Sequence, residues 1–454
     1  MAGLTGAIAA FASAGTVVPE DAARVVRAGF IDTIATMIAG RDEPVVGIVR
    51  GFVAARQSGA RESRVLFGEQ RAAAADAALI NATASHALDY DDVALSGHPS
   101  TVLVPAILAE GEHLGASGAD AVRAYLVGYE VWAELLAREP DPYHLKGWHP
   151  TSVLGTVGAA AAVAHLHRLP PGDCRNAIAL AASMACGLVG NFGTMTKPLH
   201  AGRAASCAIE AVRFAASGLT AAPDALEHHA GYLAALSPKG AADRASPPDT
   251  LGRKLRILEQ GLSIKKYPMC YATHRVIDAV LDLVNAHDLK PADVKSVQAE
   301  IGVAQASMLR NHAPVTGLEA KFSLEFAVAA ALVARKVGLA ELTDGFVAQA
   351  PVREAMGKVR TSTLDTHCPI APIFALTDRV VIEHRDGRRF ASPEVRFARG
   401  DAMLPMQDAE LKAKFADCTA GVSGLDAGGL YASLAALQDL GSLRELARTP
   451  GQVG

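Results

Sequence analysis

Apolar side chains recur every three or four residues over most of the first 260 residues, which is the spacing of helices that bury one face. This spacing predicts helices over the segments 20–40, 74–90, 117–138, 150–167, 171–189 and 199–217. Ser117 and Asp120 have the spacing of a capping box at the start of the third of these helices. Prolines between residues 218 and 260 indicate turns. The first 260 residues are therefore expected to form a helical body.

The pattern changes after about residue 260. Residues 294–303 and 378–384 alternate between apolar and polar side chains, and 389–395 has the composition of a strand that returns after the turn Arg385–Arg388. Helices are predicted among these strands over 272–287, 320–336 and 343–348, and helix returns over the tail, 407–449. The chain is therefore expected to be mainly α, with a smaller α+β domain.

Composition narrows the class of protein. Half of the 454 residues are hydrophobic and one fifth are charged, and 43 basic against 47 acidic side chains leave a net charge of −4. Disordered proteins are richer in charge and poorer in apolar residues. A near-neutral chain without long Lys/Arg runs has no electrostatic footprint for nucleic acid, and no stretch reaches the ~18 uninterrupted apolar residues of a membrane span. We therefore expect a globular protein that binds neither nucleic acid nor membrane.

The cysteines and the first residues bear on where the protein resides. The chain has six cysteines, and none of them forms a Cys-x-x-Cys pair. Cys186 and Cys207 lie in apolar stretches, so we expect reduced and mostly buried thiols. Residues 1–15 lack the basic region of a signal peptide, and Pro19 to Asp21 have the character of a cap before the next helix. Together these features predict a cytoplasmic protein.

Several common catalytic motifs are missing from the sequence. It contains no GxxxxGK[ST] loop, no GxGxxG after a predicted strand, no HExxH and no GxSxG elbow. No cluster of histidines and carboxylates has the spacing of metal ligands. The sequence therefore argues against phosphoryl transfer, hydride transfer, zinc hydrolysis and serine hydrolysis, and we expect no metal site.

Three basic residues precede prolines at the predicted starts of helices. They are His98 before Pro99, His149 before Pro150 and Lys197 before Pro198. Proline favours the first helical turn, where free N–H groups and the helix dipole attract carboxylates. Each residue taken alone is better explained as a solvated cap or a surface residue. The three together indicate a pocket for a small polyanion.

An acidic segment, HALDYDDV, lies just upstream of His98. On a helix that ends here, His86, Asp89 and Tyr90 would share one face. A carboxylate beside an imidazole changes the pKa of both groups, which suits general base catalysis. The alternative is an acidic turn at a helix end.

Five segments of the chain resemble one known family in order and spacing. They are HALDYDDV…GHPSTVLVPAILAEGE, GWHPTSVLGTVGAAAA, NFGTMTKPLHAGRAA, KKYPMC…TH and TGLEAKFSLEFAVAAAL. The family is MmgE/PrpD, which contains 2-methylcitrate dehydratase, cis-aconitate decarboxylase and iminodisuccinate epimerase. The resemblance implies a homodimer without metal or organic cofactor that removes a proton next to a carboxylate of a small di- or tricarboxylate. It also implies a large helical domain from both chain ends, 1–260 and 400–454, and an inserted, lid-like α+β domain, 261–399.

The resemblance also assigns roles to residues. As catalytic residues it implies Asp89, His98, His149, Lys197 and Lys265, with Lys266 as a rival to Lys265. As substrate-binding residues it implies Asp91, Asp92, Tyr143, His144 and Lys266. His200 and Arg203 are further binding candidates because they follow Lys197 on the same predicted helix, although a packing role explains both equally well. In this scheme His149, Asp89 or His98 is the base, and Tyr143 or His144 can return the proton.

Three departures from the family pattern bear on the reaction. Val93 stands where the decarboxylases have threonine, Phe326 replaces a pocket tyrosine, and His144 stands where the family usually has tyrosine. Loss of hydroxyl groups changes which oxygens a pocket can bind or protonate. Decarboxylation of cis-aconitate is therefore not favoured, and we predict a 2-methylcitrate dehydratase-like hydro-lyase. The alternatives are an epimerase of the iminodisuccinate type and a non-catalytic polycarboxylate-binding paralogue.

Overall fold

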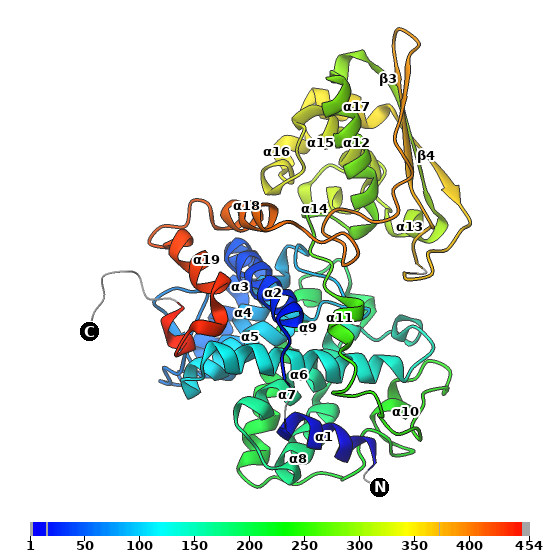
Figure 1. Ribbon diagram of the computed structural model, residues 1–454. Coiled ribbons are helices and arrows are strands. Elements are labelled where there is room, and N and C mark those ends of the chain that lie inside the picture. The colour runs from blue at the N-terminus through cyan, green and yellow to red at the C-terminus, as the bar shows by residue number, and fades with distance from the viewer. Residues whose placement is uncertain (1–2, 15–16, 372, 447–454) are drawn as a thin grey trace. The chain divides into compact units, whose positions relative to one another are not determined.

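The computed structural model describes residues 3–14, 17–371 and 373–446 of the chain. Two compact units divide the molecule (Figure 1). The first unit is formed by Met1–Ser263 and Asp408–Gly454, and the second unit by Ile264–Gln407. The fold is mainly α with a small mixed sheet, as predicted.

The first unit is helical. Its helices are α1 (Leu4–Ala14), α2 (Glu20–Ala39), α3 (Pro44–Ala55), α4 (Ala74–Ala87), α5 (Ser100–Leu114), α6 (Gly118–Ala137), α7 (Pro150–Leu166), α8 (Pro171–Met184), α9 (Thr196–Ala216), α10 (Tyr232–Leu236), α11 (Arg256–Gln260), α18 (Asp408–Thr419) and α19 (Ala427–Ala435). Short 3₁₀ turns occur at Gly40–Asp42, Tyr143–Lys146, Val189–Asn191, Leu437–Asp439 and Leu443–Glu445, and two short strands, β1 (Ser63–Arg64) and β2 (Arg71–Ala72), pair antiparallel.

Small side chains allow the central helices of this unit to pack closely. Helix α7 is buried along almost its whole length and packs against α5, α6, α8 and α9. A Cβ atom on Gly128 of α6 would lie 2.9 Å from the carbonyl oxygen of Gly158 on α7, so both glycines are required for this approach. Ser117 and Asp120 form the predicted capping box at the start of α6. The tail helices α18 and α19 pack against α2, so both ends of the chain contribute to this unit (Figure 1).

The second unit is built around a four-stranded sheet in the order β4-β3-β5-β6. The strands are β3 (Val294–Gly302), β4 (Val359–Leu364), β5 (Arg379–His384) and β6 (Arg389–Ala391); β3 is parallel to β4 and antiparallel to β5, and β5 is antiparallel to β6. The helices are α12 (His274–His287), α13 (Val303–Met308), α14 (Gly317–Ala320), α15 (Leu324–Ala334), α16 (Asp344–Val347) and α17 (Ala350–Gly357), with 3₁₀ turns at Tyr271–Thr273, Pro291–Asp293 and Leu339–Glu341.

One apolar core holds the second unit together. Helices α12, α15 and α17 lie along one face of the sheet (Figure 1) and bury aliphatic side chains against it, among them Val280, Val328 and Val352. Val297 and Ile382 contribute from the strands. This core contains Phe326, whose ring packs edge-on against Phe346 at 6.2 Å between centroids.

Several predicted element ends were wrong, and local contacts explain the differences. The helix predicted over 171–189 ends at Met184, because the carbonyl groups of Cys186 and Gly187 accept hydrogen bonds from the start of α7. The helix predicted over 320–336 begins at Leu324, because the Ser323 side chain caps it. The strand predicted over 389–395 ends at Ala391.

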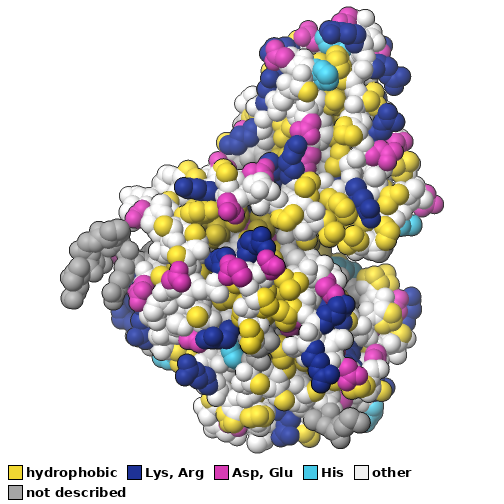
Figure 2. Space-filling model, viewed as in Figure 1, with side chains coloured by type: hydrophobic (Ala, Val, Ile, Leu, Met, Phe, Trp, Pro, Cys, Tyr) yellow, Lys and Arg dark blue, Asp and Glu magenta, His cyan; other side chains and the backbone are white. Residues whose placement is uncertain are grey.

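Further corrections concern the tail and one thiol. The predicted tail helix, 407–449, is interrupted after Thr419, and its last three residues lie outside the described part of the chain. All six cysteines lie in the described ranges and are free thiols, but Cys186 is exposed because α8 ends before it. Among the described residues, no helix is both long and apolar enough to cross a bilayer. On the face drawn in Figure 2, basic and acidic side chains are interspersed over the elements in view.

Candidate functional site

Seven polar side chains of the first unit lie together and are called the polar cluster below. They come from the end of α4, from the turn that follows it, and from the starts of α5, α7 and α9. The cluster contains His86, Asp89, Asp91, His98, His149, Lys197 and His200. Six of these seven residues were predicted to serve catalysis or binding, and His86 joins them here.

The predicted placement at helix N-termini is confirmed. His149 is the residue before α7, whose first residue is Pro150, and Lys197 lies in the first turn of α9. His98 lies two residues before α5. The first N–H groups of each helix have no partner inside the helix, so these starts carry partial positive charge.

The chain turns sharply after α4, and this turn separates three aspartates. Asp89 has a φ of +52°, the left-handed region, which aspartate tolerates better than most residues. Because α4 ends at Ala87, the prediction that His86, Asp89 and Tyr90 share one helical face was wrong. His86 instead contacts Asp91.

Asp91 connects two histidines. Its carboxylate oxygens lie 3.0 Å from His86 Nδ1 and 3.1 Å from His98 Nδ1. Burial alone would raise the pKa of Asp91, but the adjacent His86 and His98 outweigh burial and hold this pKa well below its usual value. Burial lowers the pKa of His86 to about 4, although Asp91 opposes the change. Asp91 is therefore an ionised carboxylate that lies between two imidazoles.

Asp89 faces a cation instead. Its Oδ1 lies 2.7 Å from Lys197 Nζ and 3.8 Å from His98 Nε2. The side chains of Asp89 and Lys197 are 21% and 17% exposed, so this part of the cluster is open to a small molecule. Lys197 Nζ also lies 5.6 Å from the centre of the Phe192 ring.

His149 lies deeper in the cluster. Its Nδ1 is 3.2 Å from His200 Nδ1, and its ring stacks on His86 at 6.1 Å and meets the edge of Phe192 at 4.8 Å. Burial lowers the pKa of His149 strongly, and the nearby ammonium of Lys197 lowers it further. The same two causes lower the pKa of His200. Both imidazoles are therefore neutral near pH 7.

Asp92 faces away from the histidines. Its carboxylate accepts a hydrogen bond from the Ser100 hydroxyl, and that hydroxyl lies 2.6 Å from the Tyr125 hydroxyl. Burial raises the pKa of Asp92 well above its usual value, and the carboxylate of Asp32 raises it further. Asp91 and Asp92 are neighbours in sequence, yet their pKa values shift in opposite directions.

The other predicted residues of the first unit have different surroundings. Tyr143 is buried, and its hydroxyl donates to the carbonyl oxygen of Leu135 at 3.4 Å. His144 is exposed and meets the edge of Phe192 at 6.2 Å, so it borders the cluster. Arg203 donates to Cys207 Sγ at 3.2 Å on its own helix. Val93 forms a backbone bridge with Ser263.

Lys265 and Lys266 belong to the second unit, as does Phe326. Lys265 is buried and Lys266 is partly exposed. Phe326 lies in the apolar core of that unit. The pocket roles that the resemblance implies for the two lysines remain predictions.

Sequence reasoning did not include Phe192 among the site residues, and it considered His86 only as an acid–base partner on one face with Asp89. His86 belongs to the HALDYDDV segment, where the nearby aspartates were the available signal. Phe192 belongs to the NFGTMTKPLH segment and touches His149, His144 and Lys197. Both residues also contact His149, which is distant in sequence, so a local pattern does not reveal these contacts.

The cluster also has the donor types that a divalent cation accepts. One atom each from His86, Asp89, Asp91 and His98 lies within 4.8 Å of the others. The ammonium of Lys197, 2.7 Å from Asp89, already supplies positive charge at this place. The expectation from the sequence that this site works without a metal ion is untested and stays a prediction.

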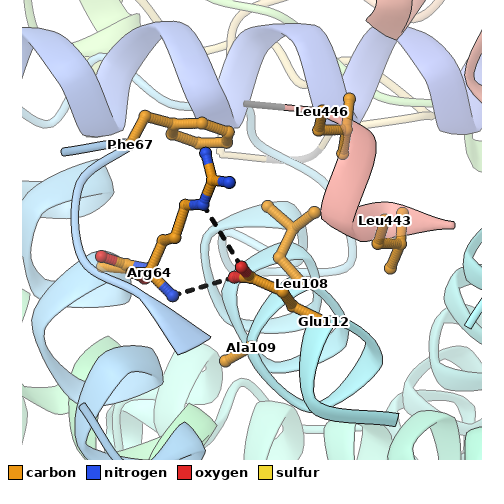
Figure 3. Close-up of a pocket in the computed structure, with 8 residues that line it drawn as sticks. Arg64, Phe67, Leu108, Ala109, Glu112, Leu443 and Leu446 are labelled. Atoms are coloured by element: carbon orange, nitrogen blue, oxygen red, sulfur yellow. Dashed lines mark hydrogen bonds and ion pairs between the residues drawn. The ribbon is translucent and has the colours of Figure 1, made fainter. Parts of the chain in front are cut away.

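A small pocket elsewhere in the first unit has a different character (Figure 3). It measures about 30 Å³, enough for one water molecule, and Arg64 and Glu112 form an ion pair at 3.4 Å across it. Leu108, Leu443 and other apolar side chains complete its wall. It shares no residue with the polar cluster, and we interpret it as a packing feature.

The geometry of the cluster restricts its chemistry. One ammonium and the starts of three helices attract carboxylates. Neutral imidazoles can accept or donate protons, and the ionised Asp91 orients His98. The arrangement therefore suits proton transfer on a small anion.

Two segments of the chain match the two domains of one known family. Residues 7–245 match the MmgE/PrpD N-terminal domain, and residues 267–428 match the MmgE/PrpD C-terminal domain. Cis-aconitate decarboxylase of Homo sapiens is 32% identical over 354 residues, covering 75% of this chain and 71% of the relative. Cis-aconitate decarboxylase of Mus musculus is 30% identical, covering 75% and 70%.

A fungal relative is more distant. Cis-aconitate decarboxylase of Aspergillus terreus is 25% identical over 309 residues, covering 62% of this chain and 61% of the relative. The two domain matches extend over most of the chain and confirm the resemblance found in the five sequence segments. The chain thus belongs to the MmgE/PrpD family.

Proposed function

We propose that this protein is a lyase of small di- or tricarboxylates that transfers a proton at a carbon next to a carboxylate. The observation that carries the proposal is the polar cluster, in which Lys197 lies among neutral or carboxylate-bound histidines at three helix starts. The names of the relatives support a lyase.

In this proposal Lys197 binds a substrate carboxylate. Its ammonium is partly exposed and now contacts Asp89 at 2.7 Å, so an incoming carboxylate would share or replace that partner. The free N–H groups at the starts of α7 and α9 add positive potential. The same charges stabilise the negative charge that develops on the substrate when a carbanion forms.

His98 is the first candidate for proton transfer. Asp91 lies at its Nδ1, and a carboxylate at one imidazole nitrogen fixes the tautomer and leaves the other nitrogen for chemistry. His98 Nε2 points toward the open part of the cluster, 3.8 Å from Asp89. His149, neutral and beside Phe192, is the second candidate.

The relatives favour decarboxylation of an unsaturated tricarboxylate such as cis-aconitate. In that reaction the bond to the leaving CO₂ breaks and its electron pair forms a new double bond. The carbon at the far end of the former double bond then takes one proton. Decarboxylation therefore needs one proton donor and a cationic site for the carbanion, both of which the cluster offers.

Dehydration of the 2-methylcitrate type is the second candidate. It needs a base that removes the proton next to a carboxylate and an acid that protonates the leaving hydroxyl. His98 and His149 can divide these roles, and Val93, where decarboxylases have threonine, favours this reaction. Epimerisation would use the same two groups on opposite faces of one carbon.

Proton NMR in D₂O separates these reactions. The purified protein is incubated with cis-aconitate, 2-methylcitrate, citrate, iminodisuccinate and malate-like acids. Loss of CO₂ with one deuterium in the product indicates decarboxylation, an alkene signal from a hydroxy acid indicates dehydration, and deuterium exchange alone indicates epimerisation. Binding of these acids without turnover would contradict the proposal and favour the non-catalytic paralogue.

The Lys197→Met variant tests the site. We expect a loss of turnover of about 100-fold or more, because the negative charge that develops in the transition state loses the ammonium of Lys197. Lys239→Met is the matched control, since Lys239 pairs with Asp141 at the same 2.7 Å but is exposed. Unchanged melting temperatures with activity lost only in the first variant support the assignment; full activity in Lys197→Met rejects it.

A further inference from the structure

A lysine from the tail of the chain contacts the turn that carries the cluster aspartates. Lys414 of α18 is buried, and its Nζ lies 2.5 Å from Asp32 Oδ1 on α2. The same Nζ donates a hydrogen bond of 2.8 Å to the backbone carbonyl of Tyr90 and lies 3.9 Å from the centre of the Tyr90 ring. Lys414 and Tyr90 are more than 300 residues apart in sequence, and both belong to the first unit.

Tyr90 occupies the central position of this turn. It follows Asp89, which contacts Lys197, and precedes Asp91, which contacts the two histidines. Holding the carbonyl of Tyr90 therefore fixes the peptide plane between the two functional carboxylates. Because Asp89 already has a left-handed φ, the turn needs contacts from outside to persist.

The turn is held at its other end as well. The Asp92 carboxylate accepts from the Ser100 hydroxyl at the start of α5. Asp92 and Lys414 thus restrain the turn from its buried side, while Asp89 and Asp91 face the cluster.

Stability alone does not explain a buried lysine at this position. Replacing a buried ion pair by apolar residues of similar volume is often neutral or stabilising, because charges lose their hydration on burial. A hydrogen bond directed at one backbone carbonyl of the acidic turn, in contrast, has a consequence for the site.

We propose that Lys414 is a positioning residue for the polar cluster. By holding the Tyr90 carbonyl, it directs Asp89 toward Lys197 and Asp91 toward His86 and His98. The proposal rests on the proposed function for its kinetic consequence, but its structural consequence can be read without turnover.

The Lys414→Met variant is the first test. We expect kcat to fall about 10- to 100-fold, because a displacement of about 1 Å at a catalytic group has effects of that size. KM should change less than about threefold, since Lys197 still binds the substrate. Lys412→Met, on the same helix but exposed, should leave kcat unchanged.

A second comparison separates positioning from lost stability. Phe415→Leu disturbs the buried side of α18 next to Lys414 and is expected to lower the melting temperature without touching Tyr90. The Asp32→Asn, Lys414→Met double variant removes both charges and should recover stability lost in Lys414→Met. It should not recover kcat, because the hydrogen bond from Lys414 to the Tyr90 carbonyl is still missing. Recovery of kcat in the double variant, or an equal loss of kcat in Phe415→Leu, would overturn the proposal.

Imidazole ¹⁵N NMR gives a readout that needs no substrate. The resonances of His86 and His98 should shift in Lys414→Met and stay in place in Lys412→Met. Unshifted resonances in Lys414→Met would reject the positioning role. If the wild-type protein turns over none of the acids in the panel, the proposed function fails, and the NMR comparison still decides this inference.

Discussion

Two buried aspartates, one in each unit, differ in the direction in which their surroundings shift the pKa. Asp91 in the first unit and Asp378 in the second are both almost fully inaccessible to solvent. The pKa of Asp91 is well below its usual value, whereas burial raises the pKa of Asp378 to about 6 despite Arg275. Burial opposes ionisation at both positions, so the neighbours decide the outcome.

The neighbours differ in number and distance. Asp91 lies 3.0 and 3.1 Å from two imidazoles, while Asp378 lies 3.6 Å from Arg275 and accepts one hydrogen bond from Gln305. Around Asp378 the second unit is an apolar core, and the carboxyl group connects α13 to the start of β5. Asp91, which stays ionised among titratable groups, therefore belongs to the candidate site. Asp378, whose pKa is raised, has a structural role, because it connects two elements of the second unit.

Asp91→Asn tests this comparison with the largest expected effect. We expect kcat/KM to fall about 10³-fold, because an amide cannot accept hydrogen bonds from two imidazoles in the orientation that a carboxylate supports. The purified variants are compared by steady-state kinetics and urea unfolding.

Asp378→Asn is the matched control. It should keep kcat/KM within about twofold, because Asp378 lies outside the polar cluster. Its stability should change by about 1 kcal/mol or less, because burial disfavours the charged form and an amide oxygen can still accept the hydrogen bond from Gln305. Equal losses of activity in both variants would remove the distinction between the two regions.

The Phe326→Tyr substitution tests the apolar core of the second unit, and we expect an effect of intermediate size on stability. A hydroxyl added inside its apolar core should lower the free energy of unfolding by about 1–3 kcal/mol, because it loses hydration without a partner. Tyr129→Phe, which removes a hydroxyl that donates to Gly261 in the first unit, should cost about 1 kcal/mol. A fully stable Phe326→Tyr variant with altered turnover would instead place residue 326 in a substrate pocket, as the family pattern implies.

The pH dependence of stability gives the smallest net effect, because two pKa shifts of opposite sign offset each other. His86 has a folded-state pKa of about 4 against an ordinary 6.5, so the unfolded chain binds more protons below 6.5 and stability falls between pH 6.5 and 4. Asp378, with a pKa of about 6 against 3.8, has the opposite sign, and its contribution improves as pH falls from 6 to 3.8. In urea titrations at several pH values, the free energy of unfolding should fall less at acidic pH in His86→Gln than in the wild-type protein. It should fall more in Asp378→Asn. The reverse changes would contradict these assignments.

Local patterns predicted much of the fold. Helical periodicity, the capping box at Ser117 and prolines at helix starts depend on residues within one turn of each other, and the structure has these features where they were expected. The positions of His149 and Lys197 at helix starts were predictable for the same reason. The end of α8 was not predicted, because His149 and Ser152 donate to the carbonyl groups that follow it. The end of α4 was not predicted either, because it depends on the left-handed φ of Asp89.

The mainly helical class, the family and the basic residues at three helix starts could be predicted from the sequence, since periodicity and motifs are properties of neighbouring residues. The partners of Asp89, Asp91 and Asp92 follow only from the folded chain, as do the contact of Lys414 with Tyr90 and that of Phe192 with Lys197. Asp89 adopts a left-handed φ after α4, and the side chains that meet at this turn come from α4, α9 and α18 and from the segments before α5 and α7. The charge of each aspartate depends on those distant partners, because burial and electrostatic neighbours set a pKa and neither is encoded in adjacent residues.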